Sequence, residues 1–232
     1  MCSLKATDTQ SPNLAQYIDH TLLRPEASEA EILRLCDEAL NHGFKTVCIE
    51  AKWLKVAAPR LKGSKVIPIT VISFPGGNDA TEKKQRDTES AVAQGAQEID
   101  MVLNRDLLRK KDYGAVFNDI QTVVRAAKNF PVKVILETSE LDDNEKRIAC
   151  ALSKAGGAAF VKTSTGFSKS GATESDIRLM REVVGPDLGV KASGGVRSLE
   201  DAMKMIKAGA TRLGTSASIA IVTGNITRSG NY

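Results

Sequence analysis

The chain has 232 residues, of which 42% are hydrophobic and 26% are charged, and its net charge is +4. This composition is typical of a globular protein, and the length suits one α/β domain with a full core. No apolar run could cross a bilayer, and basic residues are interleaved with acidic ones, so neither a membrane protein nor a nucleic-acid-binding protein is expected.

Both ends of the chain are expected to be tails that flank a single domain. Residues 1–13 form the expected N-terminal tail, residues 14–224 the domain, and residues 225–232 a flexible C-terminal tail. The start of the chain is polar and lacks the apolar core of a signal peptide. The cysteines show no paired spacing of the zinc or redox kind; they are Cys2, Cys36, Cys48 and Cys150. We therefore expect a cytoplasmic protein with reduced thiols.

Eight short runs of apolar and β-branched residues follow one another along the chain, separated by longer amphipathic stretches. The expected strands are 17–22, 46–50, 66–72, 98–102, 132–137, 159–163, 189–192 and 212–215. Several of them, such as 66–72, are apolar almost throughout, which is typical of strands that are buried on both faces.

The stretches between these runs carry recognisable helix signals. Capping boxes begin two of them, at Ser28 and at Ser198. Residues of helical spacing should face inward after each box; they are Ile32, Leu35, Cys36 and Ala39 in the first stretch, and Ala202, Met205 and Ile206 in the second. Glycines at 95, 156–157 and 209 precede the next strand, as the C-terminal caps of helices do.

This alternation predicts a (β/α)8 barrel in a single domain. An open, doubly wound sheet is the competing architecture, and it would normally show a Gly-x-Gly-x-x-Gly motif after its first strand. The motif is absent there. Eight strand candidates without a long insertion favour the closed barrel.

Two lysines, Lys162 and Lys191, lie within or at the end of apolar runs, and a glycine-bearing turn follows each. A buried ammonium group is costly, and two that lie near each other repel. Both effects lower the pKa of an amine and make it a nucleophile, as Schiff-base enzymes require. We expect Lys191 to supply most of the activation of Lys162. The alternative is that Lys162 only extends its amine into solvent at the barrel mouth.

Active sites of such barrels lie at the C-terminal ends of the strands. Polar residues at these ends are Asp19, Cys48, Asp100, Glu137 or Thr138, Lys162 and Lys191. Asp100 is either a general base or only the partner of an ion pair. Cys48 fits core packing better than catalysis. His20 follows Asp19 and could lie near the site, while His42 fits a helix end. No cluster of histidines, cysteines or carboxylates has the spacing of metal ligands, so no metal is expected.

Two further turns suit a phosphate group. One contains Gly194 and Gly195 after the seventh strand, and the other contains Gly214 and Ser216 after the eighth. The second precedes a short apolar stretch that should form a helix. Barrels often bind phosphate between these two loops and the N-terminus of such a helix.

The chain resembles the deoxyribose-phosphate aldolase family of class I aldolases from Ile18 to about Gly224. Segments that carry the resemblance are 18–23, 47–49, 98–102, 135–138, 160–167, 190–197 and 212–216. The most specific feature is Lys-Thr-Ser-Thr-Gly from Lys162, together with the later Lys-x-x-Gly-Gly from Lys191. The resemblance implies cofactor-free cleavage of 2-deoxy-D-ribose 5-phosphate to D-glyceraldehyde 3-phosphate and acetaldehyde.

The resemblance also assigns roles to the matching charged residues. Lys162 would form the Schiff base, and Lys191 would depress its pKa and assist proton transfer. Asp100 would relay protons with Lys191 through water, and Asp19 would support this network. The partners implied are a small sugar phosphate and an aldehyde, and a homodimer or a homotetramer is compatible with the family.

Binding roles follow in the same way. Gly194, Gly195 and Ser216 match positions that bind phosphate, and Thr165 matches a position near the sugar hydroxyls. Some members carry a C-terminal tyrosine that reaches the site, and Tyr232 is similar to it.

The chain departs from the family after Cys48, after Val102, and at Phe167, where some relatives carry a lysine that binds phosphate. Two other functions stay open. One is an aldolase or transaldolase-like enzyme for another sugar phosphate, and the other is an inactive barrel that acts as a scaffold.

Overall fold

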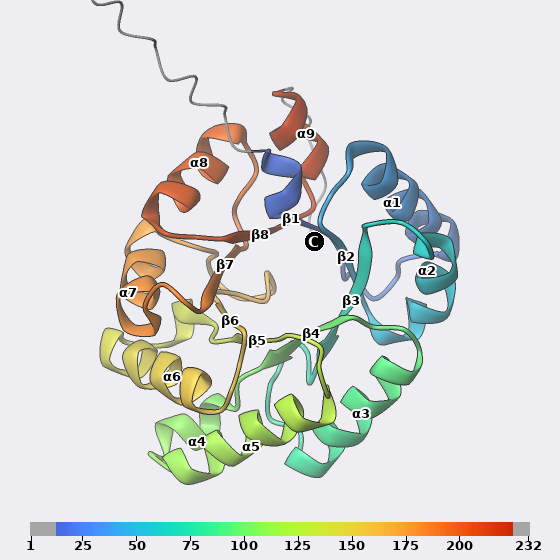
Figure 1. Ribbon diagram of the computed structural model, residues 1–232. Helices are drawn as coiled ribbons and strands as arrows, with labels where there is room; N and C mark the ends of the chain where they lie inside the picture. The colour runs from blue at the N-terminus through green and yellow to red at the C-terminus, as the bar shows by residue number, and fades with distance from the viewer. Residues whose placement is uncertain (1–12, 225–232) are drawn as a thin grey trace, which may run out of the picture.

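The eight apolar runs form eight parallel strands that close into a barrel in chain order, in a computed structural model that describes residues 13–224 (Figure 1). The strands are β1 (Ile18–Leu22), β2 (Thr46–Ile49), β3 (Ile67–Ile72), β4 (Glu98–Val102), β5 (Val132–Ile135), β6 (Phe160–Lys162), β7 (Gly189–Ser193) and β8 (Arg212–Thr215). The barrel closes where β1 pairs with β8, with Asp19 opposite Gly214. The predicted fold is therefore confirmed, and the open sheet is excluded.

Helices surround the barrel between consecutive strands (Figure 1). They are α1 (Glu29–His42), α2 (Leu54–Leu61), α3 (Thr81–Ala93), α4 (Arg105–Arg109), α5 (Tyr113–Ala126), α6 (Asp143–Ala155), α7 (Glu174–Val184), α8 (Leu199–Ala208) and α9 (Ser218–Thr223). Short 3-10 helices are η1 (Leu14–Tyr17), η2 (Ala51–Trp53) and η3 (Thr138–Glu140). None of the helices within 13–224 combines the length and hydrophobicity needed to cross a membrane.

The predicted helix signals act as expected. Capping boxes at Ser28 and Ser198 begin α1 and α8. All four predicted core residues of α1 are buried, and in α8 only Ile206 differs, since it is half-buried against the core. Positive φ values occur at Gly95, Gly157 and Gly209, so these glycines end the helices that precede β4, β6 and β8.

Strand bounds differ from the prediction mainly in β5. This strand ends at Ile135, two residues before the expected end, because Glu137 adopts a left-handed backbone conformation with φ of +60°. The chain turns there into η3. Glu137 therefore belongs to the loop at the barrel mouth and not to the barrel wall.

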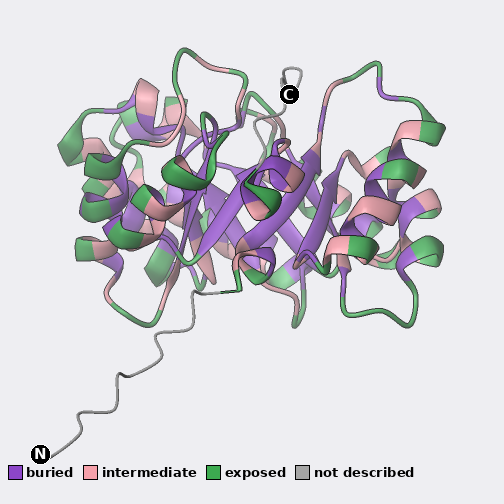
Figure 2. Ribbon diagram, turned by 90° about the horizontal axis from the view of Figure 1, so that it is seen from above, coloured by how far each residue is buried: buried purple, intermediate pink, exposed green. Residues whose placement is uncertain are grey.

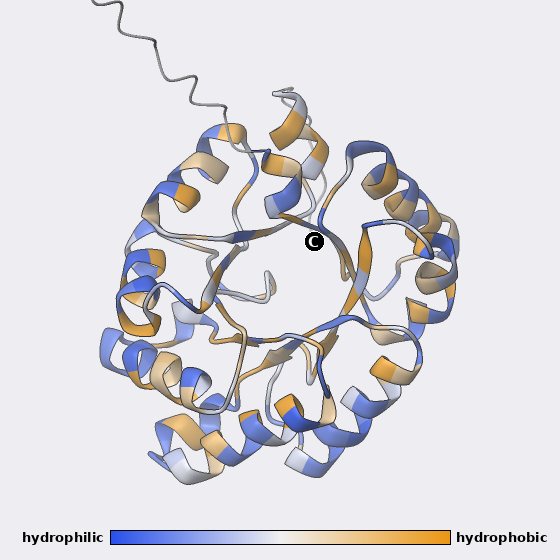
Figure 3. Ribbon diagram, viewed as in Figure 1, coloured by the Kyte–Doolittle hydropathy of each residue, from blue (hydrophilic) through white to orange (hydrophobic). Residues whose placement is uncertain are grey.

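The strands are the most buried part of the molecule, while the outer faces of the helices are exposed (Figure 2). The barrel wall also includes hydrophilic stretches (Figure 3). These stretches correspond to charged residues whose side chains are buried within the barrel. They mark the candidate site.

The predicted tails, residues 1–13 and 225–232, lie almost entirely outside the described residues; only Asn13, just before η1, is described. Tyr232 is among the residues not described.

Candidate active site

Charged side chains from six strands meet inside the barrel. They are Asp19 on β1, Glu98 and Asp100 on β4, Lys133 on β5, Lys162 on β6, Lys191 on β7 and Arg212 on β8. None is more than 6% exposed. Glu98 and Asp100 can share this interior because successive side chains of a strand point to opposite faces, so residues two apart face the same side.

Asp100 lies between three lysines. Its Oδ2 atom accepts hydrogen bonds from Lys162 Nζ at 2.9 Å and from Lys191 Nζ at 2.7 Å. Its Oδ1 atom accepts a hydrogen bond from Lys133 Nζ at 2.8 Å. The neighbouring strands bring the first two lysines together, since Lys162 is paired in register with Lys191. The predicted proximity of the two lysines is confirmed.

Asp19 and Glu98 anchor the other side of the network. Asp19 contacts Lys191 Nζ at 2.5 Å, and Arg212 donates to Asp19 Oδ1 at 2.8 Å. Thr46 on β2 also donates to Asp19 Oδ1 at 2.8 Å. Glu98 contacts Lys133 Nζ at 2.5 Å and Arg212 Nη1 at 3.1 Å. Every carboxylate of the network thus has at least two cationic partners.

Burial and these partners act on the pKa of each lysine in opposite directions. The pKa of Lys162 is below its ordinary value, and burial is the largest cause. Asp100, the one carboxylate in contact with it, raises this pKa, and the nearby charge of Lys191 lowers it further. Burial would also lower the pKa of Lys191, but Asp100 and Asp19 outweigh it and raise that pKa. Lys162 is therefore suited to be a neutral nucleophile, and Lys191 a permanent cation.

These causes correct the expected origin of the activation. Burial is the largest effect on the pKa of Lys162, and repulsion by Lys191 is a smaller one that Asp100 opposes. The prediction from sequence overstated the role of Lys191. A sequence shows neither how deeply Lys162 is buried nor that a carboxylate lies between the two amines. Lys162 is only 3% exposed, so its amine does not extend into solvent.

The two carboxylates at the centre stay ionised. Burial would raise the pKa of Asp100, but Lys133, Lys162 and Lys191 lower it well below its usual range. Burial opposes ionisation of Asp19 as well, and Lys191 and Arg212 outweigh it. Both side chains can therefore accept protons only transiently and act mainly through their charge.

Cys48 lies on β2 and is fully buried beside Leu23, Ile69 and Val71. Burial raises the pKa of its thiol, and Lys191 opposes that effect only in part. The thiol thus remains protonated and packs in the interior, as its sequence context indicated.

The loops after β6 and β7 enclose a cavity of about 170 Å³. Its lining includes the predicted Gly194 and Gly195, together with Lys169 and Arg197. Gly194 has a φ of +81°, and its backbone approaches Gly171 so closely that a Cβ atom on Gly171 would lie 2.1 Å from Gly194 O. Two cations at a glycine-rich turn suit an anionic group.

The end of β8 contacts the loop after β7, which lines part of this cavity. Thr215 donates a hydrogen bond to Val196 O at 2.7 Å, so the two predicted phosphate loops are in contact. Ser216 is half-buried between β8 and α9. Gly214 is the third residue of β8, and a Cβ atom there would lie 2.2 Å from Ser193 Oγ and 2.8 Å from Lys191 Cε. It makes room for the lysine stem.

Thr165 is held at the barrel mouth by Glu137. The Glu137 carboxylate accepts hydrogen bonds from Thr165 N at 3.1 Å and from Thr165 Oγ1 at 2.5 Å, and one from Ser168 Oγ at 2.7 Å. These contacts stabilise the strained backbone of Glu137. Phe167 follows in the same loop, is 43% exposed, and packs edge-on against Phe74.

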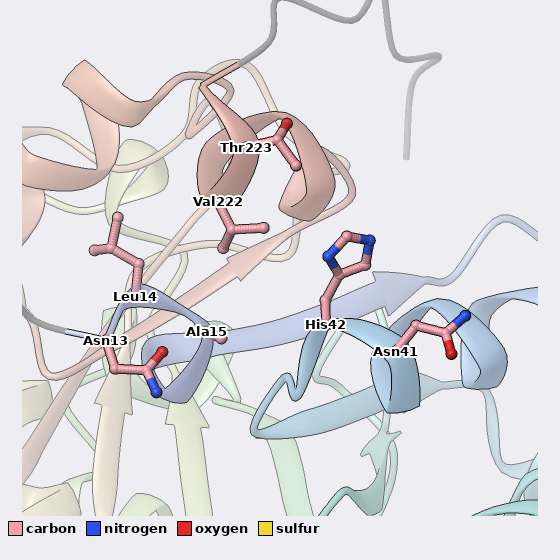
Figure 4. Close-up of a pocket in the computed structure, with 7 residues that line it drawn as sticks. All are labelled: Asn13, Leu14, Ala15, Asn41, His42, Val222 and Thr223. Atoms are coloured by element: carbon pink, nitrogen blue, oxygen red, sulfur yellow. The ribbon is translucent and has the colours of Figure 1, made fainter.

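A cavity of about 420 Å³ lies away from these residues (Figure 4). It is lined by residues of η1, of the end of α1 and of α9, among them His42. It contains none of the predicted site residues. His20 also lies apart from the lysines, between Ser218 on α9 at 2.8 Å and Glu38 on α1 at 2.9 Å.

Sequence reasoning missed three members of the network: Glu98, Lys133 and Arg212. A signal was present for Lys133, which is flanked by Val132 and Val134 in an apolar run, as Lys162 follows one. Glu98 lies two residues before Asp100, so the alternation of a strand could have placed it on the same face.

Comparisons with known proteins indicate one family of aldolases. A family model described as "DeoC/LacD family aldolase" matches residues 13–227. A deoxyribose-phosphate aldolase from Clostridium perfringens (strain SM101 / Type A) is 56% identical over 93% of this chain and 97% of the relative. A deoxyribose-phosphate aldolase from Streptococcus sanguinis (strain SK36) is 53% identical over 94% of this chain and 99% of the relative. A solved deoxyribose phosphate aldolase from Aeropyrum pernix, described as a unique tetrameric structure, is 33% identical with a TM-score of 0.86, covering 92% of each chain.

Proposed function

Because the chain belongs to the DeoC/LacD family of aldolases, we propose that it cleaves 2-deoxy-D-ribose 5-phosphate through a Schiff base on Lys162. The products are D-glyceraldehyde 3-phosphate and acetaldehyde. One observation carries the proposal: Lys162 is a buried amine with a lowered pKa, and its Nζ atom lies 2.9 Å from Asp100 Oδ2, the oxygen that Lys191 also contacts. A neutral amine beside a permanent cation is what iminium formation requires.

In the proposed mechanism, the amine of Lys162 adds to the C1 aldehyde of the open-chain sugar. The resulting carbinolamine takes up a proton and loses water to form an iminium ion. The C2–C3 bond then breaks, its electrons enter the iminium as an enamine, and the C3 hydroxyl gives up its proton. The aldehyde fragment leaves, C2 of the enamine takes up a proton, and water releases acetaldehyde from the lysine. Asp100 and Lys191 relay these protons through water, while Asp19 holds Lys191 in place at 2.5 Å.

Borohydride trapping tests the proposal. Acetaldehyde with borohydride should add one ethyl group to Lys162, which intact-mass and peptide mass spectrometry would locate. Lys162→Met should prevent the adduct and lower kcat by at least about 10³-fold, whereas Lys207→Met, an exposed lysine on α8, should leave both unchanged. An adduct that persists in Lys162→Met, or none in the wild type, would refute the mechanism; the second result would favour a scaffold.

Substrate choice separates this function from that of another sugar-phosphate aldolase. The names of the relatives at 56% and 53% identity favour deoxyribose 5-phosphate. We expect kcat/KM for this substrate to exceed that for fructose phosphates. The reverse order would assign the chain to another reaction of the same chemistry.

The phosphate is proposed to bind at the cavity of about 170 Å³ beside Gly194 and Gly195, with Ser216 from the adjoining loop. Lys169 and Arg197 line this cavity and supply positive charge, and Thr165 orients the sugar hydroxyls. This arrangement replaces the lysine that some relatives carry where this chain has Phe167. We place Gly214 in the site through its contact with the Lys191 stem.

Tyr232 is proposed to assist proton transfer at the enamine. A chain that ends at Gly230 should then have a lower kcat, and Tyr232→Phe should reproduce most of the loss. An unchanged kcat in both would remove the role.

The proposed working form is a homodimer or a homotetramer in the cytoplasm, acting on a sugar phosphate and an aldehyde and not on nucleic acid. The relative from Aeropyrum pernix is described as tetrameric, which supports an oligomer. The three described cysteines, Cys36, Cys48 and Cys150, are free and buried, which suits a reducing compartment. Light scattering of the purified chain would measure its assembly.

A further inference from the structure

We propose that Lys133 is a positioning residue of this aldolase, which fixes the orientation of Asp100 and supplies the charge that lets Lys162 react as a neutral amine. The inference rests on the proposed function and extends it to a third lysine that the motifs do not single out. Lys133 lies on β5, is fully buried, and contacts Asp100 Oδ1, whereas Lys162 and Lys191 contact Oδ2.

The first part of the inference follows from the two oxygens of Asp100. Lys133 occupies Oδ1 at 2.8 Å, which leaves only Oδ2 for Lys162 and Lys191. Lys133 is itself fixed by Glu98 at 2.5 Å and lies over the ring of Phe160, 5.7 Å from its centroid. Without Lys133, Oδ1 would be free to turn toward Lys162 and hold its proton.

The second part follows from the balance of charge in the network. Four basic side chains contact three carboxylates inside the barrel. The basic side chains are Lys133, Lys162, Lys191 and Arg212, and the carboxylates are Asp19, Glu98 and Asp100. The charges balance when Lys162 is neutral, and an unbalanced charge is costly in a buried interior. If Lys133 were neutral, the proton on Lys162 would be needed to restore the balance.

The titration of Lys162 depends on charged and titratable groups from other strands of the barrel. Inside the barrel these groups are Asp19 from β1, Cys48 from β2, Glu98 and Asp100 from β4, Lys133 from β5, Lys191 from β7 and Arg212 from β8. Those that act directly on the pKa of Lys162 are Asp100, Lys191 and Cys48, and the others act through their contacts with Asp100 or Lys191 or with the partners of these two. The sequence of β3, Ile67–Ile72, contains no titratable residue. The Cys48 thiol is protonated because burial raises its pKa, so it does not alter the balance.

The proposal predicts opposite shifts for two variants. Lys133→Met removes one positive charge, so the amine of Lys162 should keep its proton to a higher pH. The rate of trapping should therefore rise with pH around a higher midpoint than in the wild type. At pH values below the wild-type midpoint, this rate should be lower by about tenfold or more. Glu98→Gln removes one negative charge from the same ion pair, so its trapping profile should move to lower pH. Neither side chain has to touch the substrate for these shifts to occur.

The decisive experiment measures the rate of acetaldehyde trapping by borohydride against pH, with adducts on Lys162 counted by mass spectrometry. The variants are Lys133→Met, Glu98→Gln, the double variant Lys133→Met/Glu98→Gln, and Lys133→Arg, which keeps the charge. We expect the double variant to return most of the way to the wild-type midpoint, and Lys133→Arg to stay near it. A general loosening of the barrel would not produce opposite shifts that cancel.

Each outcome decides something. If the wild type forms no adduct on Lys162, the proposed function fails. If the wild type forms the adduct and the midpoint stays within a few tenths of a pH unit in both Lys133→Met and Glu98→Gln, the role of Lys133 is wrong. If Lys133→Met does not fold, the downward shift of Glu98→Gln and the unchanged profile of Lys133→Arg still carry the test, and their failure overturns the inference.

Discussion

Three lysines inside the barrel are all buried, and yet their pKa values shift in different directions. Lys162 contacts one carboxylate, whereas Lys191 contacts Asp19 and Asp100. Lys133 contacts Asp100 and Glu98, and those carboxylates together with Asp19 raise its pKa despite burial. The number of carboxylate partners therefore decides the direction in which each pKa shifts, because burial opposes the charged form of every one.

Replacing Lys162 should stabilise the protein. The pKa of Lys162 is lower in the folded chain than in the unfolded chain, so at neutral pH the unfolded state binds this proton more tightly and is favoured by it. Lys162→Met removes this effect and should raise the free energy of unfolding at pH 7 by about 0.5–2 kcal/mol. Urea unfolding of Lys162→Met and of the wild type would measure this change, with Lys207→Met as the control. A loss of stability would indicate that Lys162 is a cation stabilised by Asp100.

Gly214 should be intolerant of any side chain. Its Cβ position lies 2.8 Å from Lys191 Cε and 2.2 Å from Ser193 Oγ, so Gly214→Ala should displace the lysine that faces Asp100. Because small misplacements of catalytic groups are costly, we expect kcat/KM to fall by about 10- to 100-fold. The matched control is Gly114→Ala, where the nearest atom is Asp112 Oδ1 at 3.9 Å. Equal activity of the two variants would contradict the close contact.

At the scale of elements, a second buried ion pair joins the helices behind the site to the barrel. Lys84 on α3 contacts Asp119 on α5 at 2.5 Å and donates to Val102 O at the end of β4 at 3.2 Å. Thr81 donates to the other oxygen of Asp119 at 2.9 Å. These contacts hold two helices against the strand that carries Asp100.

Breaking this pair from one side should be costly. Lys84→Met leaves the carboxylate of Asp119 buried without its cation, with the hydrogen bond from Thr81 as its remaining contact named above. We therefore expect the free energy of unfolding to fall by about 3–5 kcal/mol. The double variant Lys84→Met/Asp119→Leu should recover most of it, because no unpaired charge remains. Lys83→Met is the control on the same helix; its pairs are exposed, so its effect should stay within about 1 kcal/mol. Chemical unfolding would rank the three, and equal losses would contradict the role of burial.

At the scale of the whole molecule, the ionised carboxylates at the barrel centre link stability to pH. The pKa values of Asp19 and Asp100 are lower in the folded chain than in the unfolded chain. Their contribution is therefore fully present above the unfolded pKa, about 3.9, and is lost as the pH falls toward the folded values. The pKa of Lys191 is raised instead, so its contribution is present at all pH values below about 10.4.

We therefore expect the free energy of unfolding to fall by about 2 kcal/mol between pH 6 and pH 3 from these two carboxylates. Guanidinium titrations at a series of pH values would measure the slope, and Asp100→Asn should flatten part of it. A free energy that stays constant over this range would show that the carboxylates are not held ionised by their lysine partners.

The sequence by itself determined the barrel and three of the charged residues that meet inside it. Alternation of apolar runs with capped amphipathic stretches specifies eight buried strands and their helices, since these patterns are local. The sequence also singled out Lys162, Lys191 and Asp100, because charged residues are rarely buried unless a partner compensates their charge. In the described part of the chain, the structure brings all three together.

Only the tertiary structure decided which charges meet and what they do to one another. Arg212 reaches Asp19 and Glu98 across 193 and 114 positions of the chain, and Lys133 approaches Asp100 through the register of β4 with β5. A strand pattern tells which side chains face inward, but the closure and stagger of the barrel set their distances. Electrostatic effects depend on distance and burial, so the direction of each lysine's pKa shift was fixed by the fold and not by its neighbours in sequence.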